Sequence, residues 1–314
     1  RGLLRGVPLA SLSPRRPHRD ELVAALPVAH IYGFTLVIGA ACAGMPVYFL
    51  QKFNPVKVLD AIETRRTSIF AGVPAMYRML MEAGAEARDL SCVRMWISGA
   101  DAMPQELSQQ FKKLGASVRL PVVGSVGEAT FAEGYGMVET GGGVAMRISP
   151  PLVSGGLGGS MGLPLPGNKF KVVDPDGNEV PVGSVGELLL SGPSILKGYH
   201  GSPEASAAAL TADGWLRTGD MARRGPLGSV NFEGRMKDVI KRGGYSVYAV
   251  EVEQDLEEHP DVLEAAVVPY PDERDGEVPV AAVRLHARAP CDEAALRAFA
   301  EGRMSRCTVP ARFV

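Results

Sequence analysis

Cysteine is scarce in this sequence, and its few cysteines form no cluster. The chain of 314 residues has four, at Cys42, Cys92, Cys291 and Cys307, and none lies in a CxxC pair. Disulfide frameworks and cysteine-based metal sites usually show much closer spacing. The pattern is typical of reduced, mostly buried thiols, and we expect a cytoplasmic protein.

Concentrated positive charge is also absent. The formal net charge is −2, and the sequence contains no large basic block. The Arg-rich start, with Arg15, Arg16 and Arg19, has no interleaved aromatic residues and is typical of a solvated loop. Because nucleic-acid binding needs a concentrated Lys/Arg surface, we exclude nucleic acid as the main partner. Nothing in the composition indicates an oligomeric state.

An uninterrupted membrane-spanning run is missing as well. The stretch Leu22–Leu50 carries no charged side chain and is long enough to cross a bilayer. However, prolines and glycines such as Pro27, Gly33 and Pro46 interrupt it. This predicts a strand, a buried helix and a second strand, and no integral membrane segment. Residues 1–20 carry charge but no compact apolar segment that ends in a cleavage site, so we expect no signal peptide there. Because the chain starts without Met, we expect upstream sequence to be missing.

The first half of the chain alternates short apolar runs with helix-length segments. Between Leu26 and Pro150, prolines stand where helices would begin, as their fixed φ allows. The expected helices are Pro55–Arg65, Pro74–Ala83 and Pro104–Leu114. Alternating strands and helices predict an α/β subdomain with a parallel or mixed sheet covered on both faces.

The pattern changes twice further along. After Gly155, glycine and proline separate short strands, which predicts a small β-barrel or sandwich. After Arg235, strands flank two expected helices, Ala249–Glu258 and Cys291–Met304, which predicts a compact α+β unit that is cut short at Val314. The expected domains are therefore residues 1–154, 155–235 and 236–314.

Glycine-rich loops are weak evidence here. Residues 155–162 (GGLGGSMG) resemble a phosphate cradle, but no Lys-Ser/Thr pair follows them. A domain connection is the better interpretation.

Three segments are more informative. In Glu133–Thr140 (EGYGMVET), an aromatic ring between glycines can lie flat on a purine, and the next carboxylate can hold Mg²⁺. In Gly214–Asp220 (GWLRTGD), a carboxylate on a glycine turn can accept both hydroxyls of a ribose. In Gly234–Gly244 (GRMKDVIKRGG), basic residues alternate with apolar ones before a glycine pair and can direct cations at a phosphate. Taken singly, these segments are equally compatible with a turn, a hairpin end and a lysine-protected edge strand.

In this order, the three segments resemble the adenylate-forming (AMP-binding) superfamily, and in particular acyl-CoA synthetases. Further matches support the resemblance: Pro27–Gly33 (PVAHIYG), Ser98–Pro104 (SGADAMP), Gly186–Pro193 (GELLLSGP) with Lys197–Tyr199, and Gly243–Glu253 (GGYSVYAVEVE). The resemblance implies a large α/β N-terminal domain with a β-barrel subdomain, here partial, followed by a small mobile C-terminal domain.

The resemblance also implies a two-step reaction with ATP, Mg²⁺ and coenzyme A on a fatty or other organic acid. The carboxylate attacks the α-phosphate of ATP, and the CoA thiol then displaces AMP from the acyl-AMP. Catalysis would consist mainly of positioning and charge neutralisation.

Residue roles follow from the same resemblance. Adenine would lie between Tyr135, with Gly136 and Met137, and the loop Gly99, Ala100 and Asp101. Glu139 would be the metal ligand, Asp220 would bind the ribose, and Arg235 would support the ribose or phosphate. Lys237 would be the hinge and Lys241 would face the site in the second step. His30, Gly243 and Gly244 would border the acyl and CoA pocket.

Departures from the family pattern leave two alternatives open. Val138 replaces the family's Thr, whose hydroxyl contacts the AMP phosphate, and the neighbouring Thr140 is a candidate replacement. The family's phosphate loop and its C-terminal catalytic lysine have no counterpart in this chain, so we expect the chain alone to be inactive in adenylate formation. The alternatives are an acyl-AMP ligase that loads a carrier protein and a catalytically impaired nucleotide-binding relative.

Overall fold

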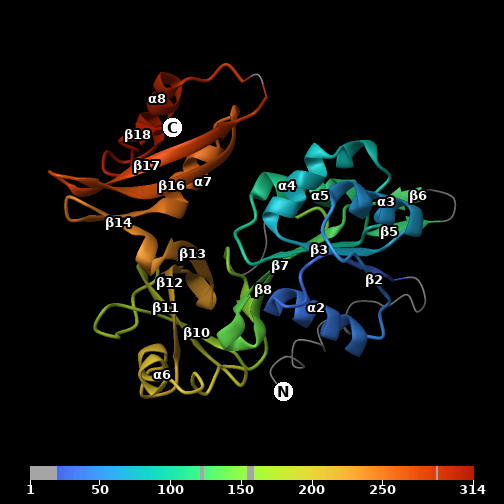
Figure 1. Ribbon diagram of the computed structural model, residues 1–314, viewed down its shortest axis with the longest axis horizontal. Coiled ribbons are helices and arrows are strands. Elements are labelled where there is room, and N and C mark those ends of the chain that lie inside the picture. Colours follow the sequence, from blue (N-terminus) through green and yellow to red (C-terminus); the bar gives the residue numbers. More distant parts are fainter. Residues whose placement is uncertain (1–19, 121–123, 154–158, 288) are drawn as a thin grey trace. The chain divides into compact units, whose positions relative to one another are not determined.

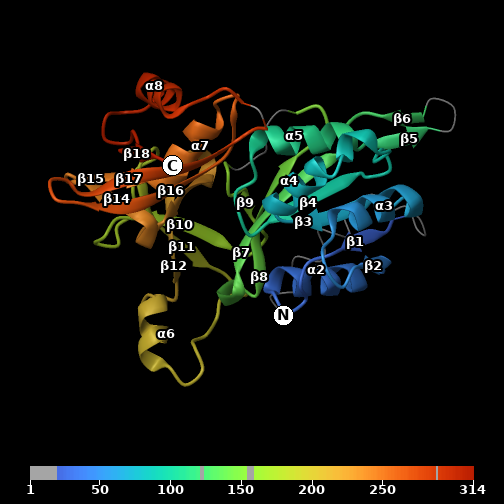
Figure 2. The same ribbon diagram turned by 45° about the horizontal axis from the view of Figure 1, so that its top comes forward.

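The computed structural model describes residues 20–120, 124–153, 159–287 and 289–314 (Figures 1 and 2). The chain divides into two compact units. The N-terminal unit runs to Lys171 and takes in Leu189–Arg217 and Gly225–Asn231. The C-terminal unit consists of Val172–Leu188, Thr218–Arg224 and Phe232–Val314. The Arg-rich start and residues 155–158 of the glycine-rich loop at 155–162 lie outside the described residues.

A mixed sheet forms the frame of the N-terminal unit. Its strand order is β2-β1-β3-β4-β7-β8-β9. The strands from β2 to β7 are parallel to their neighbours, and β8 and β9 are antiparallel. The bounds are β1 (Leu22–Ala24), β2 (Val47–Phe49), β3 (Ile69–Gly72), β4 (Met95–Gly99), β7 (Thr130–Met137), β8 (Gly142–Ser149) and β9 (Leu163–Pro164). A separate pair, β5 (Val118–Leu120) and β6 (Gly124–Val126), is antiparallel. The predicted mixed sheet is confirmed.

Helices cover both faces of this sheet, as Figures 1 and 2 show. On one face lies α2 (Ile31–Cys42); on the other lie α3 (Pro55–Arg65), α4 (Pro74–Glu82) and α5 (Gln105–Leu114). Local chemistry explains their starts: in α3, Pro55 stands in the first turn and the Asn54 side chain accepts from the Lys57 amide. The three predicted helices agree with the structure to within one residue.

The uncharged stretch folds as predicted, into β1, α2 and β2. Among the described residues, no helix is both long enough and apolar enough to cross a membrane.

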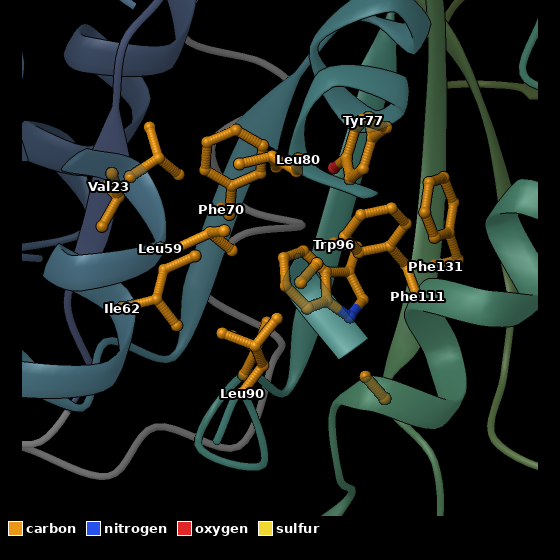
Figure 3. Close-up of a cluster of buried hydrophobic side chains, with 14 of the residues drawn as sticks. Val23, Leu59, Ile62, Phe70, Tyr77, Leu80, Leu90, Trp96, Phe111 and Phe131 are labelled. Carbon is orange, nitrogen blue, oxygen red and sulfur yellow. The ribbon is translucent and has the colours of Figure 1, made fainter. Parts of the chain in front are cut away.

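An aromatic cluster fills the layer between the sheet and helices α3 to α5 (Figure 3). Tyr77 and Trp96 each meet Phe111 edge to face, with ring centroids 4.8 and 5.0 Å apart. Phe70 and Phe131 complete the cluster, and all five rings are buried. Such pairs each add about 0.5–1.5 kcal/mol beyond area burial. This cluster holds β4 and β7 rigidly side by side.

A four-stranded sheet follows, in the order β10-β11-β12-β13. Its strands are β10 (Lys169–Val173), β11 (Val185–Ser191), β12 (Leu216–Arg224) and β13 (Val230–Arg235), and α6 (Pro203–Ala209) lies between β11 and β12 in the chain. The predicted barrel is corrected: within the described residues β10 and β13 do not pair, so this sheet stays open. Short strands and turns specify neighbours along the chain, but they do not specify closure.

The part of the C-terminal unit that follows Arg235 is α+β, as predicted. Its sheet has the order β15-β14-β17-β16, and β18 pairs with β17. Its elements are β14 (Val239–Arg242), β15 (Tyr245–Tyr248), α7 (Ala249–Glu257), β16 (Val262–Asp272), β17 (Gly276–Leu285), α8 (Glu293–Arg303) and β18 (Arg312–Phe313). Helices α7 and α8 pack Val252, Leu256, Leu296 and Ala300 on this sheet. Helix α8 begins two residues later than expected because Asp292 caps it by accepting from the Ala295 amide.

Two carboxylates of α7 bind backbone amides of β16, at one edge of this sheet. Strand β16 is an edge strand. The Glu253 side chain accepts from the Val267 amide at 2.7 Å, and Glu257 accepts from the Ala265 amide at 3.3 Å. These two amides would otherwise face outward from the sheet, and both are hydrogen-bonded to side chains of the same unit.

Candidate functional site

The predicted site residues belong to both units. The N-terminal unit contains His30, Gly99, Ala100, Asp101, Tyr135, Gly136, Met137 and Glu139. The C-terminal unit contains Asp220, Arg235, Lys237, Lys241, Gly243 and Gly244.

The loop after β4 meets the glycine segment of β7. Gly99 pairs in register with Gly134, next to Tyr135. A Cβ on Gly99 would lie 3.1 Å from the Gly134 carbonyl oxygen and 3.4 Å from the Tyr32 ring, so the close approach depends on glycine. The structure thus brings together the two segments predicted to hold adenine.

This loop also carries backbone strain. Ala100 has φ of 70°, in the left-handed region that residues with a Cβ rarely adopt. Its neighbour Asp101 stabilises the turn by accepting from the Ala102 amide at 2.8 Å. Both residues are exposed. Strain held at an exposed loop end is a common feature of functional sites.

Strand β7 has an irregularity at Gly136. The register with β8 shifts between Tyr135 and Gly136. A Cβ on Gly136 would lie 2.1 Å from the Gly142 carbonyl oxygen, so only glycine fits. Tyr135 meets Phe170 edge to face, with ring centroids 6.5 Å apart, so its ring orientation is set from one side. Met137 ends the strand, and its amide is bonded to the Thr140 hydroxyl.

Glu139 lies in a short 3₁₀ turn (Val138–Thr140) and has a partner that the sequence did not indicate. The Tyr199 hydroxyl donates to Glu139 Oε1 at 2.9 Å, and the Leu196 amide donates to the Glu139 carbonyl oxygen at 2.8 Å. The hydrogen bond to Glu139 raises the pKa of Tyr199. The only signal in the sequence was the matching motif Lys197–Tyr199, which gave no role to the tyrosine.

Thr140 does not replace the hydroxyl that Val138 lacks, so this expectation is wrong. Val138 is exposed, at 69%. Thr140 is buried, and its hydroxyl contacts the Met137 amide and the carbonyl oxygens of Met137 and Gly142, at 2.6–3.0 Å. Thr140 therefore holds the turn closed and has no hydroxyl to offer a ligand.

His30 is fixed by the start of α2. Its Nδ1 accepts from the Tyr32 amide at 3.2 Å, so the exposed ring is held as the helix N-cap. The Tyr32 hydroxyl lies 3.3 and 3.4 Å from the carbonyl oxygens of Ile97 and Gly72, and burial raises the pKa of Tyr32 well above its usual range. The turn also depends on Gly33, where a Cβ would lie 2.3 Å from the Pro27 carbonyl oxygen.

In the C-terminal unit, Asp220 and Arg235 form an ion pair on neighbouring strands. Arg235 Nε lies 2.8 Å from Asp220 Oδ1; Asp220 is buried, and the Arg235 side chain is 54% exposed. The Asp220 amide donates to the Thr218 hydroxyl, which donates to the Leu188 carbonyl oxygen. A buried, oriented carboxylate with an outward cation can bind a diol or an anion.

The basic segment ends in a hairpin turn. Lys237 is exposed in a 3₁₀ turn (Met236–Asp238), directly after β13. The Lys241 ammonium donates to the Ser246 hydroxyl at 2.8 Å across the β14–β15 pair. Gly243 and Gly244 form the turn, with φ of 54° and 87°. Within this unit, the cation and the glycine turn therefore lie at one end of the same hairpin.

Comparison with protein families identifies two domains. Residues 4–200 match the model of the AMP-binding enzyme family, and residues 251–314 match the model of the AMP-binding enzyme C-terminal domain.

Known relatives agree. The chain is 35% identical over 260 residues to "4-coumarate--CoA ligase-like 6" of Oryza sativa subsp. japonica, covering 82% of this chain and 41% of that protein. It is 32% identical over 296 residues to the "Long-chain-fatty-acid--CoA ligase" of Bacillus subtilis, covering 93% and 50%.

Solved structures extend this likeness to the fold. ATP-bound MatB from Rhodopseudomonas palustris has a TM-score of 0.82 at 29% identity, covering 99% of this chain and 59% of that one. The o-succinylbenzoate CoA synthetase (MenE) of Bacillus subtilis, in complex with its acyl-adenylate intermediate, has a TM-score of 0.80 at 26% identity, covering 99% and 60%. The chain spans about half the length of the curated relatives that it matches. The chain belongs to the AMP-binding enzyme family.

Proposed function

We propose that the whole protein is an ATP-dependent acyl-CoA synthetase acting on a fatty or other organic acid. The observation that carries the proposal is the pairing of Gly99 with Gly134, which sets the loop Gly99–Asp101 beside Tyr135. The names of the relatives support the class of reaction, because they name a CoA ligase and a CoA ligase-like protein for different acids.

The reaction has two displacements. A carboxylate oxygen of the acid attacks the α-phosphorus of ATP and pyrophosphate leaves, giving the acyl-AMP. The thiol of CoA then attacks the acyl carbonyl carbon, its proton passes to solvent, and AMP leaves. The work of the protein is to position the reactants and to neutralise phosphate charge.

In the N-terminal unit, we assign the adenine to the space between Tyr135 and the loop Gly99–Asp101. The open glycine backbone beside the ring supports this assignment, since a flat base needs such a surface. His30 would border the acyl chain from the start of α2.

Glu139 is the residue that we assign to Mg²⁺. Its carboxylate is a hard oxygen donor, and Tyr199 occupies Oε1. One carboxylate fits Mg²⁺, because this ion usually takes its other ligands from substrate phosphates and water. When bound, the ion would neutralise charge on the phosphates. The chain's own contribution is to hold this carboxylate in place from two sides, through Tyr199 and the Leu196 amide.

In the C-terminal unit, we assign the ribose hydroxyls to Asp220. Arg235 contacts this carboxylate, so ribose binding would share it or displace the guanidinium toward the phosphate. Lys237 would serve as the hinge between the two steps, and Lys241 would face the site in the second step. The turn Gly243–Gly244, which has no side chains, would leave room for the pantetheine arm of CoA.

We place the protein in the cytoplasm. All four cysteines are present as thiols, which supports a reducing compartment. Cys42 is exposed and the other three are partly exposed, so the expectation of mostly buried thiols is wrong.

A panel of carboxylic acids tests the function. The full-length protein is incubated with Mg-ATP and each acid, and AMP release is measured with CoA, with a holo-carrier protein and with neither. We expect at least one acid to give AMP and acyl-CoA with CoA present. AMP release with the carrier alone would assign the protein as a carrier-loading ligase.

A second candidate is a nucleotide-binding relative with impaired catalysis. The exposed Val138 beside the fully engaged Thr140 favours it. AMP binding by the full-length protein without ATP–pyrophosphate exchange for any acid would establish this candidate and overturn the synthetase proposal.

A further inference from the structure

Three side chains of the C-terminal unit bring together an imidazole, a carboxylate and a thiol. One ligand atom from each of His259, Asp261 and Cys291 lies within 4.8 Å of the others. His259 Nε2 and Cys291 Sγ are 3.9 Å apart. All three residues are partly buried, and none belongs to the nucleotide or CoA site proposed above.

The fold holds these groups from two helix ends. His259 follows α7, and its ring packs edge to face on Phe299 of α8, with centroids 4.8 Å apart. The Asp261 carbonyl oxygen accepts from the His286 amide at 2.9 Å, which ties this turn to the segment before α8. Cys291 directly precedes Asp292, the N-cap of α8. The ligand atoms are thus placed by packing and backbone bonds, and the ion itself is not needed to gather them.

We propose that His259, Asp261 and Cys291 form a binding site for a zinc-type divalent cation. Thiolate, imidazole and carboxylate together suit Zn²⁺ and Co²⁺, whereas Mg²⁺ and Ca²⁺ prefer oxygen ligands alone. Three protein ligands leave a fourth position for water. On binding, the sulfur forms a bond to the cation and the thiol proton leaves to solvent.

Local charge supports a cation at this place. The Asp261 carboxylate lies within 4.8 Å of the Cys291 sulfur and of the His259 ring. A divalent cation bound by the three groups would compensate the charge of this carboxylate.

One existing contact limits the affinity. The Asp261 amide donates to His259 Nδ1 at 3.1 Å, so Nδ1 carries no proton. Ligation through Nε2 needs the ring proton on Nδ1, and this backbone bond must then open. We expect binding to be weaker than at a closed structural zinc site for this reason. The bound ion would tie the end of α7 to the start of α8.

Cobalt titration tests the site. The chain is stripped with a chelator, dialysed and titrated with Co²⁺ while the absorption spectrum is recorded. We expect a thiolate-to-cobalt charge-transfer band in the near ultraviolet that saturates at one equivalent and disappears when Zn²⁺ is added. Absence of this band from the wild-type chain would overturn the proposal.

Variants locate the site. Cys291→Ser should abolish the band, and His259→Gln should weaken Co²⁺ binding by at least about tenfold. Cys307→Ser is the matched control, because Cys307 is also a partly exposed thiol of this unit, and it should retain the band. Circular dichroism without metal checks that each variant folds. A band that persists in a folded Cys291→Ser variant would refute the assignment.

Discussion

At the residue scale, the Thr140 hydroxyl is present in the sequence but is unavailable to a ligand in the folded segment Met137–Thr140. Thr140 lies two positions after the valine that replaces the family's threonine. Its hydroxyl is used entirely within the turn. Sequence spacing could not reveal this, because it depends on which way a short turn points its side chains.

Val138→Thr should therefore raise activity. A hydroxyl at this exposed position could contact the AMP phosphate, and a hydrogen bond to a charged group is worth about 1.5–3 kcal/mol. We expect kcat/KM for adenylate formation by the full-length protein to rise about tenfold. Stability should change by less than about 0.5 kcal/mol, since the site is exposed. ATP–pyrophosphate exchange measures the effect, with Val138→Ala as the control. Equal rates for the two variants would contradict the prediction.

Tyr199→Phe tests the contact with Glu139. Without the hydroxyl, the carboxylate loses the bond that orients it, which costs about 1 kcal/mol. The Mg²⁺ concentration for half-maximal adenylate formation should rise about fivefold as a result. A magnesium titration measures this shift. Tyr245→Phe, at an exposed tyrosine of the hairpin turn, should leave it unchanged. An unchanged or lower requirement in Tyr199→Phe would show that the hydroxyl does not orient Glu139 as a metal ligand.

At the element scale, strands β7 and β8 hold a charged pair in the sheet. Glu133 and Arg147 are register partners, and their side chains lie 2.9 Å apart with 14% and 17% exposed. Burial raises the pKa of Glu133 above its ordinary value of 4.5, although Arg147 acts in the opposite direction. The native state therefore holds this proton more tightly than the unfolded chain does.

The sign of the pH effect follows from this shift. The contribution of Glu133 to stability is complete below pH 4.5 and is lost as the pH rises through its raised native pKa. Glu133→Gln keeps a hydrogen-bond acceptor and does not titrate. Relative to this variant, the wild-type free energy of unfolding should fall as the pH rises above 4.5. Urea denaturation across this range measures the difference, with Glu273→Gln as an exposed control. A parallel pH dependence in wild type and Glu133→Gln would contradict the prediction.

Elements set by local chemistry could be predicted from the sequence. Helix α3 begins at Pro55 after the cap Asn54, and both signals are adjacent in the chain. The open sheet of β10 to β13 was not predicted, because closure depends on pairing between distant strands. The contact of Glu139 with Tyr199 joins residues 60 apart, and only folding brings them together. The same holds for the cluster of His259 and Cys291.

At the scale of the whole molecule, each unit contains a residue to which we assign a nucleotide contact. Tyr135 belongs to the N-terminal unit and Asp220 to the C-terminal unit. Each residue should therefore contribute to AMP affinity. Base stacking on an aromatic ring is worth about 1–3 kcal/mol, and a hydrogen bond to a charged group contributes a similar amount.

Tyr135→Ala and Asp220→Asn should each weaken AMP binding by about tenfold or more. Isothermal titration calorimetry of the full-length protein measures both, and Tyr245→Ala serves as the control. Wild-type affinity in Asp220→Asn would contradict the assignment of Asp220 to the ribose, and wild-type affinity in Tyr135→Ala would contradict the assignment of Tyr135 to the adenine.

The carboxylates of Glu253 and Glu257 give the C-terminal unit a further property. Both carboxylates accept hydrogen bonds, from the Val267 and Ala265 amides. These two donors therefore cannot pair with a β-strand of a second molecule. Neutral, shorter side chains at these two positions would leave the Val267 and Ala265 amides available to a β-strand of another molecule. We expect such a variant to self-associate into fibre-like aggregates in concentrated solution.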